Sequence, residues 1–331
     1  MRLKLVPSET SFDFFKLQNL TFGLSLLGVI ASIVLFALVG LNYGIDFRGG
    51  SVIMVETPEP VATEEYRTLI GTLDVGDATV TEISDPAAEL TGAAQNAALI
   101  RIEQQGEGDA SQTEMLQGVR AALEAEFEGL EVLSTESVGA KVSGELVQAG
   151  ILAVALAVAA VLFYIWLRFE WQFSVAAVAA LVHDVILTIG VFSLIGLEFN
   201  LAIIAAILTI VGYSLNDTVV VFDRVRENLR RYKQLPLREV LNLSLNETLS
   251  RTIMTSVTTL IALVSLYVLG GEVIRGFTFA MIWGIVIGTY SSVFVAAPIL
   301  LRLGVKRDWS TTDEDGKPKR TGTGKYAHID A

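Results

Sequence analysis

The sequence predicts an α-helical polytopic membrane protein with six transmembrane helices and a small α+β domain between the first and second helices. Hydrophobic residues make up 52% of the 331 residues and charged residues only 18%, a balance typical of integral membrane proteins. Six apolar runs are long enough to cross a hydrocarbon core of about 30 Å. The stretch after the first run has no such runs and shows short alternating segments instead.

The first apolar run, Leu20–Leu41, follows a short polar N-terminus, residues 1–19. We interpret it as a retained span, because the apolar region of a cleaved signal peptide is shorter. The other five runs are separated by short loops, at about Leu146–Leu167, Phe173–Leu197, Leu201–Phe222, Thr252–Leu269 and Phe277–Leu301. When six spans are drawn, the Lys and Arg clusters all fall on one side, which predicts that both termini are cytoplasmic and the α+β domain is outside.

The α+β domain, residues 42–145, is predicted from alternating apolar residues and amphipathic segments. Its expected strands are Ser51–Thr57, Ala78–Ser84, Ala97–Glu103 and Glu131–Val138, and its expected helices are Thr63–Leu73 and Ser111–Phe127. The resulting order, βαββαβ, suggests a ferredoxin-like layer with helices on one face of a sheet. Such a layer is a binding or docking scaffold, since nothing in it has catalytic spacing.

Two other segments lie on the cytoplasmic side. Residues 224–250 are charged but carry an apolar stripe that includes Leu237, Val240, Leu241 and Leu245. This pattern predicts an amphipathic connector between the fourth and fifth spans. Residues 306–331 are rich in Thr, Gly, Lys and Asp, which predicts a disordered tail.

Asp217 is the feature of the membrane domain that most demands an explanation. It lies inside the fourth apolar run, and an ionisable residue within a span usually faces the protein interior, has a partner and serves a function. At about 1.5 Å of rise per residue it is about 24 Å from the start of that run, within the cytoplasmic quarter of the bilayer. We therefore expect Asp217 to take up and release a proton.

Arg251 opens the fifth run from the same side and is the expected partner of Asp217. Protonation of the carboxylate would leave the guanidinium unpaired and change how the two helices pack. Polar residues expected to line the approach are Thr209, Tyr213 and Asn216 on the face of Asp217, and Thr255 on the face of Arg251. An alternative stays open, in which the pair only closes a polar seam between two helices.

His183 and Asp184 lie about 15 Å into the third run, near the bilayer midplane. Adjacent residues on a helix point about 100° apart, so His183 is not expected to share the face of Asp184. Two roles remain open for these residues. His183 makes an interhelical hydrogen bond, or Asp184 relays a proton to Asp217 through water.

Several function classes are disfavoured. The sequence has no nucleophile–base–acid spacing and no cluster of carboxylate or imidazole neighbours, so we expect neither an enzyme nor a metal or cofactor site. It has no cysteine, which excludes disulfides and thiol catalysis. The net charge of −12 comes mostly from acids in the α+β domain, and no basic stripe suggests a nucleic-acid partner.

Two glycine-containing segments have structural roles. GIDFRGG, residues 44–50, reads as a tight loop that pins the outer domain to the membrane, with Asp46 and Arg48 bonded locally and Gly49 and Gly50 supplying the turn. Gly284 and Gly288 make a small face on the sixth span where another helix packs closely. A helix of this chain and a helix of another chain are equally compatible with that face.

Five motifs together resemble the SecF family, the smaller membrane subunits of bacterial SecD–SecF protein-export complexes. They are GIDFRGG (44–50), VGAKVSGEL (138–146), VHDV (182–185), GYSLNDTVVVFDR (212–224) and TLSRT (248–252). The resemblance covers about residues 12–305. One departure is Ala140, where the family motif usually has proline, and we expect this change to affect only the stiffness of the loop.

The family belongs to the resistance–nodulation–division superfamily, in which SecD and SecF each contribute six spans to a pseudo-symmetric pair. The resemblance implies a proton-motive-force-coupled accessory subunit of the Sec preprotein translocase in the bacterial inner membrane, with residues 42–145 in the periplasm. It implies SecD, the SecYEG translocon, YajC, unfolded preproteins and protons as partners. It also implies that Asp217 and Arg251 take part in proton conduction, with a further Asp supplied by SecD.

Two other functions compete with this one. A proton-driven exporter of small molecules or lipids in the same superfamily generally carries much larger outer domains than the one predicted here. A non-conducting structural subunit would use Asp217 only as packing glue between helices.

Overall fold

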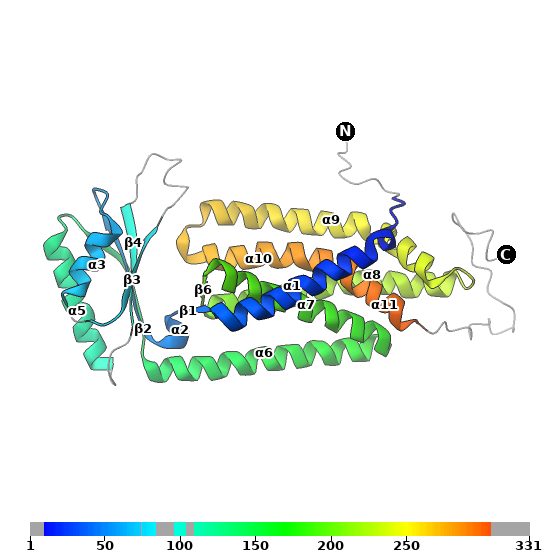
Figure 1. Ribbon diagram of the computed structural model, residues 1–331, viewed down its shortest axis with the longest axis horizontal. Coiled ribbons are helices and arrows are strands. Elements are labelled where there is room, and N and C mark those ends of the chain that lie inside the picture. Colours follow the sequence, from blue (N-terminus) through cyan, green and yellow to red (C-terminus); the bar gives the residue numbers. More distant parts are fainter. Residues whose placement is uncertain (1–9, 74, 84–95, 104–108, 306–331) are drawn as a thin grey trace.

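A computed structural model describes residues 10–73, 75–83, 96–103 and 109–305, and the expected tail at 306–331 lies outside the described residues. A bundle of long helices occupies one part of the molecule, and a sheet with two helices on its outer face lies at one end of that bundle (Figure 1). Among these described residues, six helices are long and apolar enough to cross a membrane, which confirms the six predicted spans: Phe14–Val39, Ala140–Arg168, Trp171–Ile195, Leu201–Arg231, Leu237–Leu269 and Val273–Leu303.

The helices of the bundle come in chain order. A short 3₁₀ turn, η1 (Phe14–Leu17), precedes α1 (Gln18–Val39). After the sheet domain follow α6 (Ala140–Arg168), α7 (Trp171–Ile195), α8 (Leu201–Arg231) and α9 (Leu237–Leu269). The last span is broken into α10 (Glu272–Ser291), a π-helical turn η2 (Ser292–Ala296) and α11 (Ala297–Leu303).

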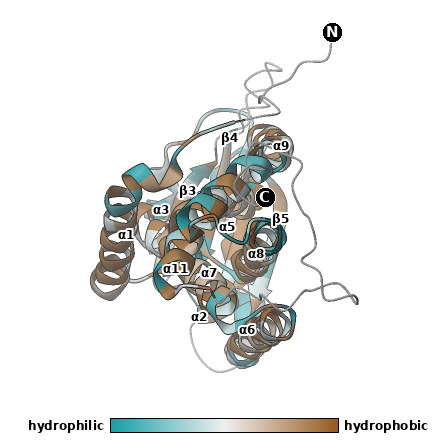
Figure 2. Cartoon of the chain, turned by 90° about the vertical axis from the view of Figure 1, so that its right-hand side faces the viewer, coloured by the Kyte–Doolittle hydropathy of each residue, from teal (hydrophilic) through white to brown (hydrophobic). Residues whose placement is uncertain are grey.

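The bundle has an inner and an outer set of helices. Helices α7, α8 and α10 are the most buried, whereas α1, α6 and α9 are largely exposed. Large apolar side chains cover the outside of the exposed helices, for example Leu27 on α1, Ile151 on α6 and Ile261 on α9. Figure 2 shows this hydrophobic colouring on α1 and α6. A surface of this kind is expected where helices meet lipid tails or a partner's spans.

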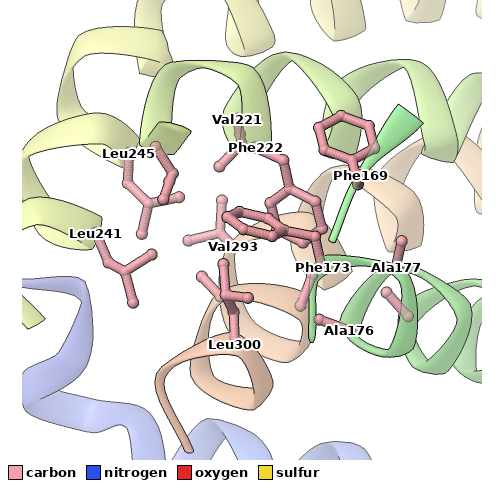
Figure 3. Packing of buried hydrophobic residues seen from close by; sticks show 14 of the residues in the cluster. Phe169, Phe173, Ala176, Ala177, Val221, Phe222, Leu241, Leu245, Val293 and Leu300 are labelled. Atoms are coloured by element: carbon pink, nitrogen blue, oxygen red, sulfur yellow. The ribbon is translucent and has the colours of Figure 1, made fainter. Parts of the chain in front are cut away.

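Two clusters of buried apolar residues hold the inner helices together. One lies toward the sheet domain and includes Phe192, Ile203 and Ile285. The other lies toward the opposite end and joins α7, α8, α9 and the η2–α11 segment. Figure 3 shows Phe173 and Phe222 packed at the centre of this second cluster, with their rings 5.2 Å apart and nearly perpendicular.

The sheet domain has the predicted βαββαβ order. Its elements are β2 (Gly50–Thr57), α3 (Thr63–Gly71), β3 (Ala78–Ile83), β4 (Asn96–Ile102), α5 (Asp109–Glu126) and β5 (Glu131–Val138). The strands lie in the order β3-β4-β2-β5 and every pair is antiparallel. Alternate residues of β2 point to one face, so Ile53 and Val55 pack with Tyr66 and Ile70 of α3 in the domain core.

A short linkage joins the sheet domain to the bundle. Strand β1 (Asn42–Tyr43) pairs in parallel with β6 (Glu198–Phe199), which lies between α7 and α8. A single helical turn, α2 (Ile45–Arg48), then leads into β2. Two segments far apart in the sequence are therefore held side by side at the end of the bundle nearest the sheet.

The structure corrects the expected connector at residues 224–250. Helix α8 continues to Arg231, and after a short turn α9 begins at Leu237 and runs unbroken to Leu269. The apolar stripe exists, since Val240 and Leu241 are fully buried, but it packs as the first turns of a span. The charged residues suggested a surface helix. In the structure they lie on the extended ends of α8 and α9, where ion pairs such as Arg224–Glu247 satisfy them.

Candidate functional site

Buried polar residues gather in the middle of the bundle on each of its inner helices. On α7 and α10 they lie between residues of the two apolar clusters, and on α8 they lie among residues of the second cluster, between Val211 and Val221. The buried members are His183, Asp184 and Thr188 on α7, Ser214, Asp217 and Thr218 on α8, and Ser291 and Ser292 at the end of α10 and the start of η2. Such residues in the middle of a membrane protein must satisfy one another, because lipid offers no hydrogen-bond partners.

Asp217 points into the bundle and is only 7% exposed. Its Oδ1 accepts a hydrogen bond from the Thr252 hydroxyl of α9 at 2.7 Å, and its Oδ2 accepts one from the Ser292 hydroxyl of η2 at 3.1 Å. Both donors are neutral, so the carboxyl is held in place by three elements without a buried cation. The buried, partnered carboxyl expected from the sequence is therefore present.

The expected ion pair between Asp217 and Arg251 is wrong for this chain taken alone. Arg251 is exposed, and no carboxylate of the described residues forms an ion pair with it. The reason is helical geometry: neighbouring residues point about 100° apart, so when Thr252 faces Asp217, Arg251 faces outward.

Asp184 is the second buried carboxyl, at 2% exposure. Its Oδ2 accepts hydrogen bonds from the hydroxyls of Ser214 at 2.6 Å and Ser291 at 2.8 Å. Its Oδ1 lies 2.9 Å from His183 Nδ1. The expectation that these neighbours do not meet is wrong, because rotation of the histidine side chain brings its ring back to the adjacent carboxyl.

His183 is itself buried, at 5% exposure, and its ring lies against Tyr290 with the centroids 6.3 Å apart. The interhelical hydrogen bond considered for it is not formed within the described part of the chain, where its Nε2 has no partner. When Nδ1 carries the ring proton and donates to Asp184, Nε2 keeps a lone pair that can accept a hydrogen bond.

The two carboxyls occupy one layer of the bundle. Ser291 donates to Asp184 and Ser292 donates to Asp217, and these serines are neighbours in sequence. Adjacent residues differ by about 1.5 Å along a helix axis, so the two carboxyls lie at similar depth. The depths expected from the sequence placed Asp184 at the midplane and Asp217 in the cytoplasmic quarter. They were too far apart because the calculation took each helix as upright and independent.

The polar residues expected beside Asp217 mostly lie elsewhere. Thr209 and Asn216 are on the exposed face of α8, and Thr255 is exposed on α9, where its hydroxyl donates to its own helix. Tyr213 is half-buried and its hydroxyl reaches Thr259 of α9 at 3.5 Å. At 100° per residue, Thr209 and Asn216 are turned about 80° and 100° from Asp217 around α8, and this rotation leaves them outside while the carboxyl points inward. Thr255 shares the exposed face of Arg251, as expected.

Sequence reasoning missed the hydroxyl donors Ser214, Thr252, Ser291 and Ser292. The sequence contains a signal for them, since each is a polar residue inside an apolar run and two of them lie close to a charged residue. Ser214 precedes Asp217 by three residues, which is one turn of helix, and Thr252 follows Arg251 directly. Serine and threonine are too common in membrane helices for that signal to single them out.

Close packing of α8 against α10 brings these groups together. A Cβ atom on Gly284 would lie within 2.6 Å of three side-chain atoms of Ile210, and one on Gly288 would lie 3.0 Å from Ser214 Cβ. Glycine is therefore required at the crossing. The small face on the sixth span packs inside this chain.

The loop of residues 44–50 fixes the start of α8. Asp46 Oδ2 accepts a hydrogen bond from the Leu201 N–H at 2.8 Å, which satisfies an amide at the N-terminus of that helix, and the Asn200 side chain accepts from Ile203 N–H. Arg48 pairs with Glu103 of the sheet domain at 3.3 Å, so the expected local bond between Asp46 and Arg48 is wrong. Gly49 and Gly50 have φ values of 74° and 125°, which only glycine adopts readily.

Glu198 of β6 makes a second contact with the sheet domain. Its carboxylate pairs with the Arg101 guanidinium of β4. Burial raises the pKa of the Glu198 carboxyl, and the nearby Arg101 charge opposes that shift. Among the described residues, the Nε of Arg101 is buried without a hydrogen-bond partner, so this contact carries a desolvation cost on both sides.

Two family models match the chain. The model described as "Protein export membrane protein SecD/SecF, C-terminal" matches residues 119–306, and the "SecD/SecF GG Motif" model matches residues 34–57, which include Gly49 and Gly50. Among curated relatives, the chain is 52% identical to a protein translocase subunit SecF of Cereibacter sphaeroides, covering 100% of this chain and 99% of that protein. It is 50% identical to the SecF subunit of Rhodobacter capsulatus, with 96% of each covered.

A longer relative and a solved structure agree with this assignment. A protein translocase subunit SecDF of Brucella abortus is 43% identical, and the match covers 92% of this chain but 39% of that protein. The crystal structure of SecDF from Thermus thermophilus, a translocon-associated membrane protein, superposes with a TM-score of 0.80 at 33% identity, covering 92% of this chain and 40% of that one. This chain therefore belongs to the SecF branch of the SecD/SecF family of protein export membrane proteins.

Proposed function

We propose that this chain is a subunit of the bacterial preprotein translocase that couples the proton motive force to protein export, working beside SecD. Membership of the family gives the role in protein export and the bacterial inner membrane as its setting. The coupling is our inference from the membrane domain. The competing functions, an exporter of small molecules and a non-conducting subunit, are separated from it by the experiment described below.

One observation carries the proposal: Asp217 is buried in a membrane-spanning helix and is held only by neutral hydroxyls. A carboxyl locked to a buried cation would strand that cation on protonation. Here protonation leaves two hydroxyls that change from donating to accepting, or turn to other acceptors. Asp217 is therefore suited to gaining and losing a proton at modest cost.

Protonation of Asp217 would act on how α8, α9 and η2 pack, since its two hydrogen bonds join those three elements. A proton that crosses the membrane potential supplies about 2.3 kcal/mol per 100 mV. That energy is comparable to a hydrogen bond between a hydroxyl and a charged group, about 1.5–3 kcal/mol. The gradient is thus sufficient to bias a packing change that involves one or two such bonds.

The exposed face of α8 and α9 is the proposed contact surface for SecD. Ala205, Thr209, Gly212 and Asn216 form an exposed small and polar stripe on α8, and Arg251, Thr255 and Thr258 form one on α9. Polar groups at this depth are costly against lipid, and small residues allow close helix approach. A partner with a carboxylate at this depth would pair with Arg251, next to Thr252 and Asp217.

This contact surface is testable by cross-linking, because the chain has no cysteine of its own. Gly212→Cys is expected to form a disulfide with a cysteine scanned along the spans of SecD. Ile151→Cys, on the lipid-exposed side of α6, is the matched control and is expected to form none. Cross-links at Ile151 with none at Gly212 would place the partner on the other side of the bundle.

The orientation and the remaining partners follow from the same proposal. Arg224, Arg226, Arg230, Arg231 and Lys233 gather at the end of the bundle away from the sheet, which predicts a cytoplasmic position for that end and for both termini. The sheet domain is then periplasmic and is proposed to contact preproteins that emerge from SecYEG, with YajC as an accessory partner. No nucleic acid, metal, cofactor or enzymatic step has a place in this function.

The decisive test is export driven by a proton gradient, measured in vesicles that contain SecYEG, SecD and this chain. Asp217→Asn keeps the side-chain shape but cannot change its charge, so gradient-dependent export is expected to fall about tenfold or more while export driven by ATP alone remains. Arg251→Met is expected to lower gradient-dependent export as well. Normal gradient dependence in both variants would reject the coupling, and loss of assembly with SecD in Asp217→Asn would favour the structural subunit.

A further inference from the structure

Ser291 and Ser292 are neighbours in sequence, and each donates to a different buried carboxyl. Among the described residues, no other adjacent pair contacts Asp184 through one member and Asp217 through the other. Ser291 Oγ lies 2.8 Å from Asp184 Oδ2, and Ser292 Oγ lies 3.1 Å from Asp217 Oδ2. Both serines are fully buried, so no water from outside competes for these bonds. The pair therefore links two carboxyls that stand on different helices.

Each of these serines has a second acceptor in its own helix. Ser291 Oγ lies 3.2 Å from the Gly288 carbonyl oxygen, and Ser292 Oγ lies 3.0 Å from the Thr289 carbonyl oxygen. A hydroxyl carries one proton and two lone pairs. It can donate to a charged carboxylate, or it can donate to the helix carbonyl and accept a hydrogen bond from a neutral carboxylic acid.

The other hydroxyls on the two carboxyls have no such choice. Among the described residues, Ser214 has only Asp184 as an acceptor and Thr252 has only Asp217. These two donors fix the positions of the carboxyls. The two serines differ because they can reverse the direction of their hydrogen bonds without moving a heavy atom.

Their position in the helix is also unusual. Ser291 is the last residue of α10 and Ser292 is the first residue of the π-helical turn η2. Pro298 follows shortly, and its missing N–H accounts for a break in the regular hydrogen-bond ladder. Single π-helical turns often lie at functional sites, and this one sets the two hydroxyls toward different neighbouring helices.

We propose that Ser291 and Ser292 form a hydroxyl switch that keeps Asp184 and Asp217 hydrogen-bonded in both protonation states. A hydronium ion gives up its proton and becomes water when the assembled complex admits it to the buried polar residues, and the proton binds Oδ2 of either carboxylate. Of the ionisable groups nearest these carboxyls, His183 lies 2.9 Å from Oδ1 of Asp184, and Arg251 is exposed beside Thr252. The new carboxylic O–H donates to the serine oxygen, and the serine proton turns to the carbonyl of Gly288 or Thr289. This proposal deepens the proton-coupled function, on which it rests, by naming two positioning residues.

The test replaces each serine singly in the complex with SecD and SecYEG. Ser291→Ala and Ser292→Ala remove one hydrogen bond from the protonated carboxyl, so its infrared C=O stretch is expected to rise in frequency. Gradient-dependent export is expected to fall about tenfold, with a changed pH profile. Ser256→Ala is the matched control, because its buried hydroxyl joins α9 to α10 through Thr289 without touching either carboxyl.

The outcomes separate this proposal from the function on which it rests. Serine variants whose carboxyl band and export match those of Ser256→Ala would overturn the switch, even if Asp217→Asn abolishes coupling. A shifted carboxyl band in the serine variants, together with unimpaired export in Asp217→Asn, would support the switch while rejecting the proton-coupled function. Poor folding of an alanine variant is recognised by loss of the SecD complex, and Ser291→Cys or Ser292→Cys then supplies a variant of nearly native size with a weak donor.

Discussion

The membrane bundle and its linkage to the sheet domain satisfy acidic groups in different ways. In the bundle, Asp217 is held by hydroxyls alone, and Asp184 is held by hydroxyls and the His183 ring. In the linkage, Glu198 is held by the Arg101 guanidinium and Glu103 by that of Arg48. A hydroxyl can donate to a charged carboxylate or accept a hydrogen bond from a neutral carboxylic acid, whereas a guanidinium can only donate. The contacts in the bundle therefore suit the change of charge that we propose, and the guanidinium contacts join the sheet domain to the bundle.

The largest effect on stability is expected at Asp184, the buried carboxyl with the most hydrogen-bonding neighbours. Asp184→Leu leaves the hydroxyls of Ser214 and Ser291 and the Nδ1 of His183 without their shared acceptor. We expect it to lower the free energy of unfolding by about 3 kcal/mol or more. Thermal unfolding in detergent measures this loss. Asp184→Asn, which retains an acceptor oxygen, is expected to lose less, and equal losses in the two variants would break the comparison.

A smaller effect is expected at Thr252, whose hydroxyl donates to Asp217. Thr252→Val preserves the shape of the side chain and removes this bond, at an expected cost of about 2 kcal/mol. Thr248→Val is the matched control one turn earlier on α9, where the buried hydroxyl donates only to backbone carbonyls of its own helix. The two unfolding midpoints, measured side by side, are expected to differ. Identical midpoints would mean that the hydroxyl contributes nothing to holding the carboxyl.

The smallest expected effect is in the linkage and depends on pH. Burial raises the pKa of the Glu198 carboxyl above its ordinary value of 4.5, so the folded protein binds this proton more readily than the unfolded chain does. The contribution of Glu198 to stability is therefore full below about pH 4.5 and declines as the pH rises through its folded pKa.

Glu198→Gln removes this titration while keeping an oxygen that accepts from Arg101. The stability of the native protein minus that of the variant is therefore expected to fall as the pH rises from 4 toward neutrality, within about 1 kcal/mol. Unfolding curves of both proteins at several pH values give this difference. A difference that grows with pH would mean that the attraction of Arg101 outweighs the cost of burial.

Much of the fold was predictable because it depends on patterns that repeat along the chain. Apolar runs gave six spans, and alternation gave all four strands of the sheet within a residue or two of their ends. The ends of α8 and α9 were not predictable, since charged residues there continue the helices while pairing with one another. The π-helical turn likewise has no signature apart from Pro298.

The site was predictable only in part. Burial of Asp217 and Asp184 follows from the cost of a charge in lipid, which the sequence reveals directly. Their partners do not, because they depend on which face of each helix turns inward and on the glycine-lined crossing of α8 and α10. Opposite charge suggested Arg251, whereas the neighbouring Thr252 makes the contact. Long-range pairing of side chains is a property of packing that no local pattern specifies.

The central claim is that Asp217 changes its protonation inside the assembled complex. An infrared titration of that complex, recorded for the native chain and for Asp217→Asn as the pH is lowered, tests it most directly. We expect a protonated-carboxyl band that grows in the native complex and is missing from the variant. Titration spectra that coincide for the two complexes would contradict the claim.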